Sequence, residues 1–189
     1  MASTAPAPAA VIVMAAGKGT RMRSATPKVL HTIGGRSLLA HAVAAARGLH
    51  PDHLVVVVRH ERDAVVAHLA EVAPDAVAAD QDEVPGTGRA VACGLASLPA
   101  DLTGPVVVTS GDVPLLDTAT LRDLLAQHAR RGDAVTLLTT VLDDPTGYGR
   151  VVREDDGPDS PVSAIVEQRD ASPEQRAITE INAGVYVFD

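Results

Sequence analysis

Long apolar runs divide the first part of the chain. AVIVMAAG at residues 10–17, HLVVVVR at 53–59 and GPVVVTS at 104–110 are apolar along their length instead of alternating with polar residues. Strands of this kind are typical of a sheet that is covered on both faces. We therefore expect three buried strands here, with further strands at residues 76–80 and 133–142.

Helical patterns lie between these runs. Apolar residues recur at helical spacing over residues 37–48, 63–72 and 118–132, and a fourth helix begins near Thr87. Ser37 is suited to cap the first helix, and glycines end the first and the last. Strands that alternate with helices, joined by right-handed crossovers, predict an α/β fold. The expected architecture is doubly wound, with a mostly parallel sheet and helices on both faces.

The two ends of the chain differ from this pattern. Residues 1–10, MASTAPAPAA, lack the charged and apolar regions of a signal peptide, so we expect a disordered leader before a domain at 11–189. Residues 143–170 are rich in turn-forming residues, with short alternating strands, which predicts a hairpin-like insertion at the mouth of the sheet. Residues 180–189 predict one more strand.

Composition narrows the class of protein. Aromatic residues are only 2%, so the core must consist mainly of Ala, Val and Leu. The formal charge of −8 opposes a general nucleic-acid or anionic-membrane surface, so any phosphate site must be local. Without a run of about 20 apolar residues, we expect a soluble, cytoplasmic protein. The single cysteine, Cys93, excludes an intrachain disulfide, and we expect it to be a small buried hydrophobe.

The loop after the first strand concentrates glycine and positive charge. It fails the GxGxxG pattern, because Met22 stands at the third glycine, and it has no GxxxxGK[ST] motif. Its two glycines still allow the backbone to approach a phosphate, and Arg21, Lys18 and Lys28 supply cations. The alternative is a glycine-rich turn with solvated cations.

Other polar groups follow other strands. Asp112 ends the most apolar strand and could hold Mg²⁺, although it could also cap a turn. Gln81 precedes a Gly86-Thr87 helix start and could read a base edge. Because ligands of open parallel sheets bind at the carboxyl ends of strands, we expect residues 15–28, 81–88, 110–112, and 167 with 182 at one rim.

Two other kinds of site are disfavoured. The seven histidines form no metal-binding pair with an acidic partner, so we expect solvated or capping histidines. Ser110 lies in TSGD rather than in a GxSxG elbow, so covalent catalysis is not indicated.

These motifs resemble those of the sugar-nucleotide pyrophosphorylases, nucleotidyltransferases with a Rossmann-like fold. The family signature LAAGxGTRM…PK stands here as MAAGKGTRM…PK, with Met14 in place of Leu. Further along, PKVLH, QDEVPGTGRA, SGDVPLL, DDPTGYGRVVRE, IVEQRDASPEQR and EINAGVYVFD extend the similarity to residue 189. They resemble most the uridyltransferase domains that make UDP-N-acetylglucosamine.

The resemblance implies a role for each matched position. Arg21 and Lys28 would be catalytic, clamping the triphosphate, and Asp112 would bind the cofactor Mg²⁺. Gly149, Glu167 and Asn182 would hold the N-acetylglucosamine moiety. The remaining substrate-binding positions would be Met14, Ala15, Ala16, Gly17, Gln81, Gly86, Thr87, Ser110 and Gly111, with Lys28 shared. Many relatives have Tyr at position 110, so we expect slightly different packing beside the nucleotide.

The implied reaction transfers UMP from UTP to N-acetyl-α-D-glucosamine 1-phosphate, giving UDP-N-acetylglucosamine and pyrophosphate for peptidoglycan synthesis. A phosphate oxygen would displace pyrophosphate directly, a step that needs alignment and charge neutralisation. In the family the domain continues beyond residue 189 with a second Mg²⁺ ligand, then a β-helix domain that acetylates glucosamine 1-phosphate. The resemblance thus implies a domain truncated at its C-terminus, from a full-length homotrimer.

Three alternatives stay open. The chain could be another sugar-phosphate nucleotidyltransferase, such as a thymidylyl or cytidylyl transferase. It could be an inactive module that only binds a sugar nucleotide. A nicotinamide-dependent oxidoreductase fits less well, because the third glycine and a downstream ribose-binding acid are missing.

Overall fold

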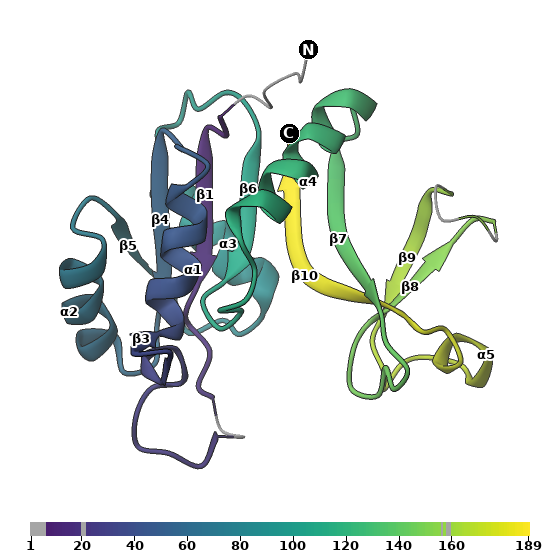
Figure 1. Ribbon diagram of the computed structural model, residues 1–189, viewed down its shortest axis with the longest axis horizontal. Helices are drawn as coiled ribbons and strands as arrows, with labels where there is room; N and C mark the ends of the chain where they lie inside the picture. Colours follow the sequence, from purple (N-terminus) through teal and green to yellow (C-terminus); the bar gives the residue numbers. More distant parts are fainter. Residues whose placement is uncertain (1–6, 20–21, 156, 158–159) are drawn as a thin grey trace. The chain divides into compact units, whose positions relative to one another are not determined.

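The computed structural model describes residues 7–19, 22–155, 157 and 160–189 (Figure 1). The chain forms two compact units. The first comprises Met1–Thr136 with Tyr186–Asp189, and the second comprises Leu137–Val185.

A parallel sheet forms the centre of the first unit. Its strands, in spatial order, are β5 (Val77–Asp80), β4 (His53–Val58), β1 (Ala10–Met14) and β6 (Val106–Ser110). The end of β10 (Glu180–Phe188) adds an antiparallel strand beside β6, with Tyr186 opposite Val108. The mixed, mostly parallel sheet predicted from the apolar runs is confirmed.

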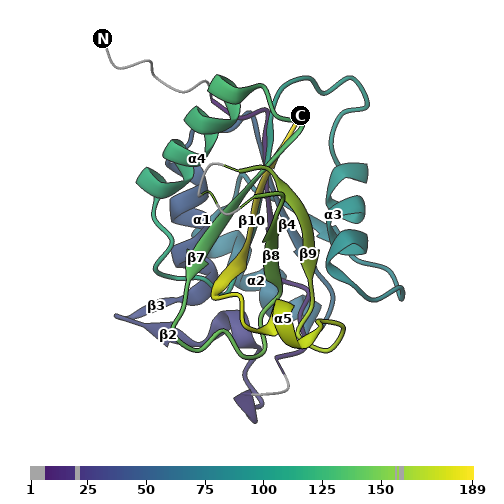
Figure 2. The ribbon, with the colours of Figure 1, turned by 90° about the vertical axis from the view of Figure 1, so that its right-hand side faces the viewer.

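Helices cover both faces of this sheet. They are α1 (Leu38–Arg47), α2 (Arg62–Val72), α3 (Thr87–Ala96) and α4 (Thr118–Arg131). Figure 2 shows α1 and α4 on one side of the strands and α3 on the other. As predicted, Ser37 caps α1 by accepting a hydrogen bond from the backbone N–H of Ala40, and Gly132 ends α4 in the left-handed conformation. None of the described helices is long and apolar enough to cross a membrane.

The core of the first unit is built from small aliphatic side chains. Ile12 and the valines of β4 are fully buried, since β1 and β4 have helices on both sides. Tyr186 and Phe188 stack at 5.7 Å between ring centroids and pack against the same core. Cys93 of α3 is only half-buried, so the expectation of a buried cysteine was wrong. The expected core of Ala, Val and Leu is confirmed.

Two further expectations need correction. The disordered leader was predicted to extend to residue 10, but its last two residues belong to the folded unit. Residues 1–6 lie outside the described part of the chain. Ala9 and Ala10 are 4% and 0% exposed, because Ala9 donates to the Pro105 carbonyl and accepts from the His53 N–H, which prolongs β1 between its neighbours. His128 is a core residue rather than a solvated one, hydrogen-bonded to Thr136 Oγ1 and Asp189 Oδ1.

Antiparallel strands make up most of the second unit. β8 (Arg150–Arg153) pairs with β9 (Val162–Val166) and with β10, and the one-turn helix α5 (Pro173–Arg176) starts with a capping box. β7 (Val135–Val141) also pairs with β10, so β7 and β10 carry the chain into and out of this unit. The insertion predicted at residues 143–170 therefore lies here.

Candidate functional site

The candidate site starts where β1 and β6 end. Met14 and Ser110 lie opposite each other as the last residues of the two parallel strands. Gly111 then donates its backbone N–H to the Met14 carbonyl at 2.9 Å, which holds the two following loops side by side. This is the edge at which open α/β sheets bind ligands.

A cavity of about 420 Å³ opens between these loops, and we call it the first cavity. Six of the predicted site residues line it: Met14, Ala15, Gly17, Lys28, Ser110 and Asp112. Among the described residues, Gly19, Met22 and Val29 also line it. The predicted convergence of the first loop with residues 110–112 is therefore present in the structure.

An ion pair between Lys28 and Asp112 joins the two sides of the first cavity. Lys28 begins the short 3-10 helix η2 (Lys28–Leu30), which the buried Val29 anchors to the body of the unit. Its Nζ contacts Asp112 Oδ2, while Ser110 donates to Oδ1 of the same carboxylate. Burial alone would raise the pKa of Asp112, but hydrogen bonds from Lys28 and Ser110 outweigh it and lower the pKa. The carboxylate is therefore charged at neutral pH.

Gly19 brings the glycine loop against Lys28. Its φ of +62° lies in the left-handed region, and a Cβ placed there would be 2.6 Å from Lys28 Cβ. A side chain at position 19 would therefore both strain the loop and displace the lysine.

A second cavity, of about 360 Å³, shares Met14, Gly17 and Ser110 with the first. It contains four more of the predicted site residues, Ala16, Gln81, Gly86 and Thr87. Lys18, Arg59, His60, Pro85 and Ala90 also line it. Described members of the predicted groups at residues 15–28, 81–88 and 110–112 thus line two adjoining cavities of the first unit.

Gln81 has a defined orientation in the second cavity. Its side-chain nitrogen donates to the carbonyls of Val84 at 3.0 Å and Gly86 at 3.2 Å. Both amide hydrogens are therefore used, and the side-chain oxygen is the group left to accept a hydrogen bond. Gly86 caps α3 without a side-chain hydrogen bond, so the helix also brings backbone N–H groups to the cavity. A ligand that carries both a donor and an acceptor fits this arrangement.

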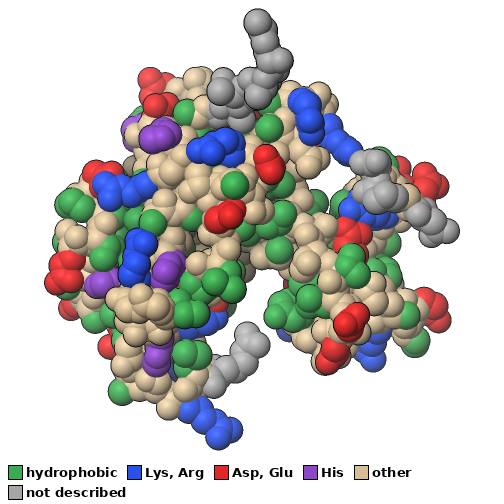
Figure 3. All heavy atoms as spheres, viewed as in Figure 1, with side chains coloured by type: hydrophobic (Ala, Val, Ile, Leu, Met, Phe, Trp, Pro, Cys, Tyr) green, Lys and Arg blue, Asp and Glu red, His purple; other side chains and the backbone are tan. Residues whose placement is uncertain are grey.

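The positive charge at the candidate site comes from a few side chains that line the two cavities. On the face of the molecule drawn in Figure 3, basic and acidic side chains are interspersed. Within the described lining of the two cavities, Lys18, Lys28 and Arg59 supply cations. The predicted Arg21 lies outside the described residues. Anion binding would accordingly depend on these few side chains and on backbone N–H groups.

The remaining predicted residues lie in the second unit. Asn182 donates its backbone N–H to the Gly149 carbonyl at 3.0 Å. A Cβ on Gly149 would lie 3.1 Å from Glu167 Oε1, so these two residues are also neighbours. The structure thus gathers Gly149, Glu167 and Asn182 from three segments of the chain.

Sequence reasoning missed Arg59 and His60 as lining residues. Both directly follow β4, and the rule that ligands meet the carboxyl ends of strands could have found them. It also missed the bond from Ser110 to Asp112, since we expected Ser110 to bind substrate and to change the packing beside the nucleotide, but not to contact the carboxylate.

Comparisons with known proteins give a consistent result. The sequence model of the MobA-like NTP transferase domain matches residues 11–175. The bifunctional protein GlmU of Kineococcus radiotolerans is 61% identical over 188 residues, and that of Micrococcus luteus is 55% identical. These alignments cover 99% and 100% of this chain but 38% and 40% of the relatives, so the chain spans well under half of their length.

Solved structures share the fold at low sequence identity. A UDP-glucose pyrophosphorylase complexed with UDP-glucose has a TM-score of 0.72 at 16% identity, over 95% of this chain and 75% of that chain. A putative glucose-1-phosphate thymidylyltransferase from Bacillus anthracis has a TM-score of 0.73 at 18% identity, over 95% and 70%.

Proposed function

The chain belongs to the family of MobA-like NTP transferase domains, and from this premise we propose that it acts on UTP and N-acetylglucosamine 1-phosphate. The products would be UDP-N-acetylglucosamine and pyrophosphate. The identity of 55–61% to bifunctional GlmU proteins over nearly the whole chain supports this choice of substrates within the nucleotidyltransferases.

The observation that carries the proposal is the Lys28–Asp112 pair beside a glycine loop. A triphosphate needs cations and close backbone N–H groups, and a metal-assisted transfer needs a carboxylate at the same place. Lys28, the loop around Gly17 and Asp112 provide these groups around one cavity.

The second cavity suits the base of the nucleotide. Uracil carries an N–H flanked by two carbonyl oxygens. The free side-chain oxygen of Gln81 can accept from that N–H, and backbone N–H groups at Gly86 and Thr87 can donate to a carbonyl. The donor and acceptor pattern thus supports a uracil nucleotide.

Nucleotidyltransferases of this kind use a divalent metal, and we propose Mg²⁺ held by Asp112. No group of three or more His, Cys, Asp or Glu side chains that could hold a metal occurs among the described residues. A single carboxylate fits Mg²⁺, which keeps several waters and takes its other ligands from substrate phosphates. The ion would supply charge neutralisation on the phosphates.

We propose that the sugar phosphate is held by Gly149, Glu167 and Asn182. The carboxylate of Glu167 and the amide of Asn182 are groups that bind sugar hydroxyl and acetamido groups well. Their proximity within the second unit, given that they come from separate segments, supports one shared role.

Transfer would be a direct in-line displacement. A phosphate oxygen of the sugar 1-phosphate attacks the α-phosphorus of UTP, its bond forms as the bond to pyrophosphate breaks, and both electrons of that bond leave with pyrophosphate. Lys28 would stabilise charge on the α-phosphate and the leaving group, together with Arg21. Such transfers need no protein nucleophile, which agrees with the absence of a GxSxG elbow in the sequence.

Pyrophosphate release tests the proposal. The chain is incubated with N-acetylglucosamine 1-phosphate, MgCl₂ and one nucleotide at a time, UTP, CTP or dTTP, and the rates of pyrophosphate release are compared. Preference for UTP supports it, and preference for dTTP or CTP indicates another nucleotidyltransferase. Calorimetric binding of UDP-N-acetylglucosamine without any turnover would identify an inactive binding module instead.

A further inference from the structure

The loop at residues 81–86, which we call the base loop, joins β5 to α3. Its first residue, Gln81, holds the loop in its folded shape through hydrogen bonds. Gln81 is only 9% exposed, and its backbone N–H donates to the Val58 carbonyl of β4 at 2.9 Å. Its side-chain nitrogen holds the carbonyls of Val84 and Gly86, three and five residues further on. The orientation of the Gln81 amide therefore depends on the folded shape of the base loop.

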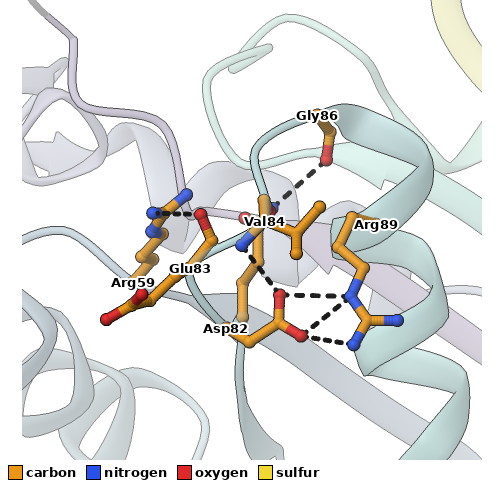
Figure 4. A network of polar contacts seen from close by, with 7 residues as sticks. Arg59, Asp82, Glu83, Val84, Gly86 and Arg89 are labelled. Carbon is orange, nitrogen blue, oxygen red and sulfur yellow. Dashed lines mark hydrogen bonds and ion pairs between the residues drawn. The ribbon is translucent and has the colours of Figure 1, made fainter.

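An ion pair between Asp82 and Arg89 also holds the base loop against α3 (Figure 4). The Nε of Arg89, in the first turn of α3, donates to both oxygens of Asp82 at 2.9 and 3.1 Å, and Nη2 also contacts Oδ2. Asp82 Oδ1 accepts the backbone N–H of Val84 at 3.1 Å as well. A guanidinium that grips a carboxylate with two nitrogens fixes its direction as well as its distance. Asp82 thus ties the middle of the loop to the helix.

Arg59 adds a tie to the neighbouring strand. It follows β4, and its Nη2 donates to the Glu83 carbonyl at 2.9 Å (Figure 4). The hydrogen bond from Arg89, with smaller contributions from the Val84 N–H and the charge of Arg59, lowers the pKa of Asp82. Asp82 therefore stays charged, and the ion pair stays formed, throughout the neutral range.

We propose that Asp82 and Arg89 are positioning residues that set the base selectivity of the site. Neither residue is part of the lining of either cavity, whereas Gln81 and Gly86 are. By holding the base loop closed, the pair keeps both hydrogens of the Gln81 amide on loop carbonyls and leaves only the oxygen for the base. This inference rests on the proposed binding of UTP.

Loss of the Asp82–Arg89 pair should change the selectivity between UTP and CTP. If the base loop opens, the Gln81 amide can rotate and present its NH₂ group instead of its oxygen. Cytosine has an acceptor at N3, where uracil has its N–H, so a rotated amide that presents its NH₂ group there would favour CTP. Selectivity between UTP and CTP should therefore fall, which a general loss of stability would not cause.

Thermal stability should change little. The side chains of Arg89 and Asp82 are 46% and 42% exposed, and ion pairs this exposed contribute little to global stability. Closure of a loop is a local equilibrium, however, and apparent affinity falls in proportion to the closed fraction. Arg89→Ala keeps a good helix-forming residue in α3.

Calorimetry with UTP and with CTP, each with MgCl₂, tests this on the 189-residue chain. We expect Arg89→Ala to weaken UTP binding about three- to fivefold. CTP binding should weaken less, so that the ratio of the two dissociation constants shrinks. Arg89→Lys, which keeps the charge but loses the planar fork, should recover part of the ratio. Melting temperature is measured on every variant.

The matched control is Arg47→Ala, which breaks the exposed Arg47–Asp75 pair, 43% and 58% exposed, away from the cavities. It should leave both dissociation constants unchanged. If Arg89→Ala binds UTP and CTP like the unchanged chain, the positioning role is wrong while the proposed function stands. If the unchanged chain binds neither nucleotide, both fail.

Discussion

Lys28 and Asp112, 84 residues apart in sequence, form an ion pair in the first cavity. Their side chains are 33% and 25% exposed, so both remain accessible to a ligand. Each charge has a different task in the proposed reaction, since the lysine would meet phosphate oxygens and the aspartate would meet the metal. Substrate and metal binding would therefore replace this ion pair with two other contacts, one from Lys28 to phosphate and one from Asp112 to the metal.

Lys28→Ala should lower turnover by at least about tenfold, because a preorganised cation would be lost from the charge that develops during transfer. The fold should be intact, since Lys28 is part-exposed and Val29 keeps η2 in place. Steady-state pyrophosphate release and thermal melting are the measurements. Turnover close to that of the unchanged chain would remove Lys28 from the mechanism.

Asp112→Asn should raise the Mg²⁺ concentration needed for half-maximal activity sharply. The variant keeps the shape of the side chain but loses the charge that attracts a divalent ion. Activity is measured against MgCl₂ concentration at saturating substrates. An unchanged titration curve would count against Asp112 as the ligand.

Gly19→Ala should reduce turnover much as Lys28→Ala does, because the new methyl group would lie 2.6 Å from Lys28 Cβ and push the lysine away. Gly34→Ala is the control, since Gly34 has a similar φ of +58° but nothing within 4 Å of the new Cβ. Both variants carry the backbone cost of a positive φ, and only the first should lose turnover. Equal turnover in both would show that Lys28 had not been displaced.

Gly149→Ala should raise the KM for the sugar phosphate and leave the KM for UTP unchanged. Its Cβ would lie 3.1 Å from Glu167 Oε1 and 3.2 Å from Ile165 Cγ2, so the glutamate would have to shift. Initial rates with one substrate varied at a time separate the two constants. A rise confined to UTP would contradict the assignment of Gly149 to the sugar.

Glu180→Gln should destabilise the chain at pH 7 by about 1–3 kcal/mol and much less at pH 3. The hydrogen bond from Arg153 lowers the pKa of Glu180 below its ordinary 4.5, so the folded state favours the charged form. That stabilisation is present above pH 4.5 and is lost as pH falls through the lowered pKa.

Urea unfolding at the two pH values measures this difference. Asp170→Asn is the control, because its pair with Arg169 is 87% and 63% exposed and should contribute little at either pH. A difference for Glu180→Gln that persisted at pH 3 would point to a cause other than charge.

The positions of the strand ends could be predicted from the sequence, but the orientations of the side chains at those ends could not. The apolar runs gave β1, β4 and β6, and the rule on carboxyl ends of parallel strands brought Lys28, Gln81 and Asp112 to one edge. That β10 runs antiparallel to β6 could not be read from its apolar pattern, because an alternating or apolar run has no direction. The end of the leader was misjudged, since the run of alanine and proline at residues 5–10 resembles a disordered segment although Ala9 and Ala10 are buried.

In the base loop, too, side-chain orientation could not be predicted from the sequence. Gln81 was found as a candidate from its residue type, but its orientation depends on two backbone carbonyls that only the folded loop brings within reach. The Asp82–Arg89 pair is seven residues apart, across a turn, whereas side chains that pair along one helix are three or four residues apart. Its geometry follows from the turn at Gly86, where φ is +119°.

The most direct test of the whole account is to identify the product. The chain is mixed with UTP, N-acetylglucosamine 1-phosphate and MgCl₂, and the mixture is analysed by mass spectrometry, with Asp112→Asn in parallel. We predict UDP-N-acetylglucosamine and pyrophosphate in equal amounts from the unchanged chain, and much less of both from Asp112→Asn. Absence of UDP-N-acetylglucosamine from the unchanged chain, or equal formation by both proteins, would contradict the account.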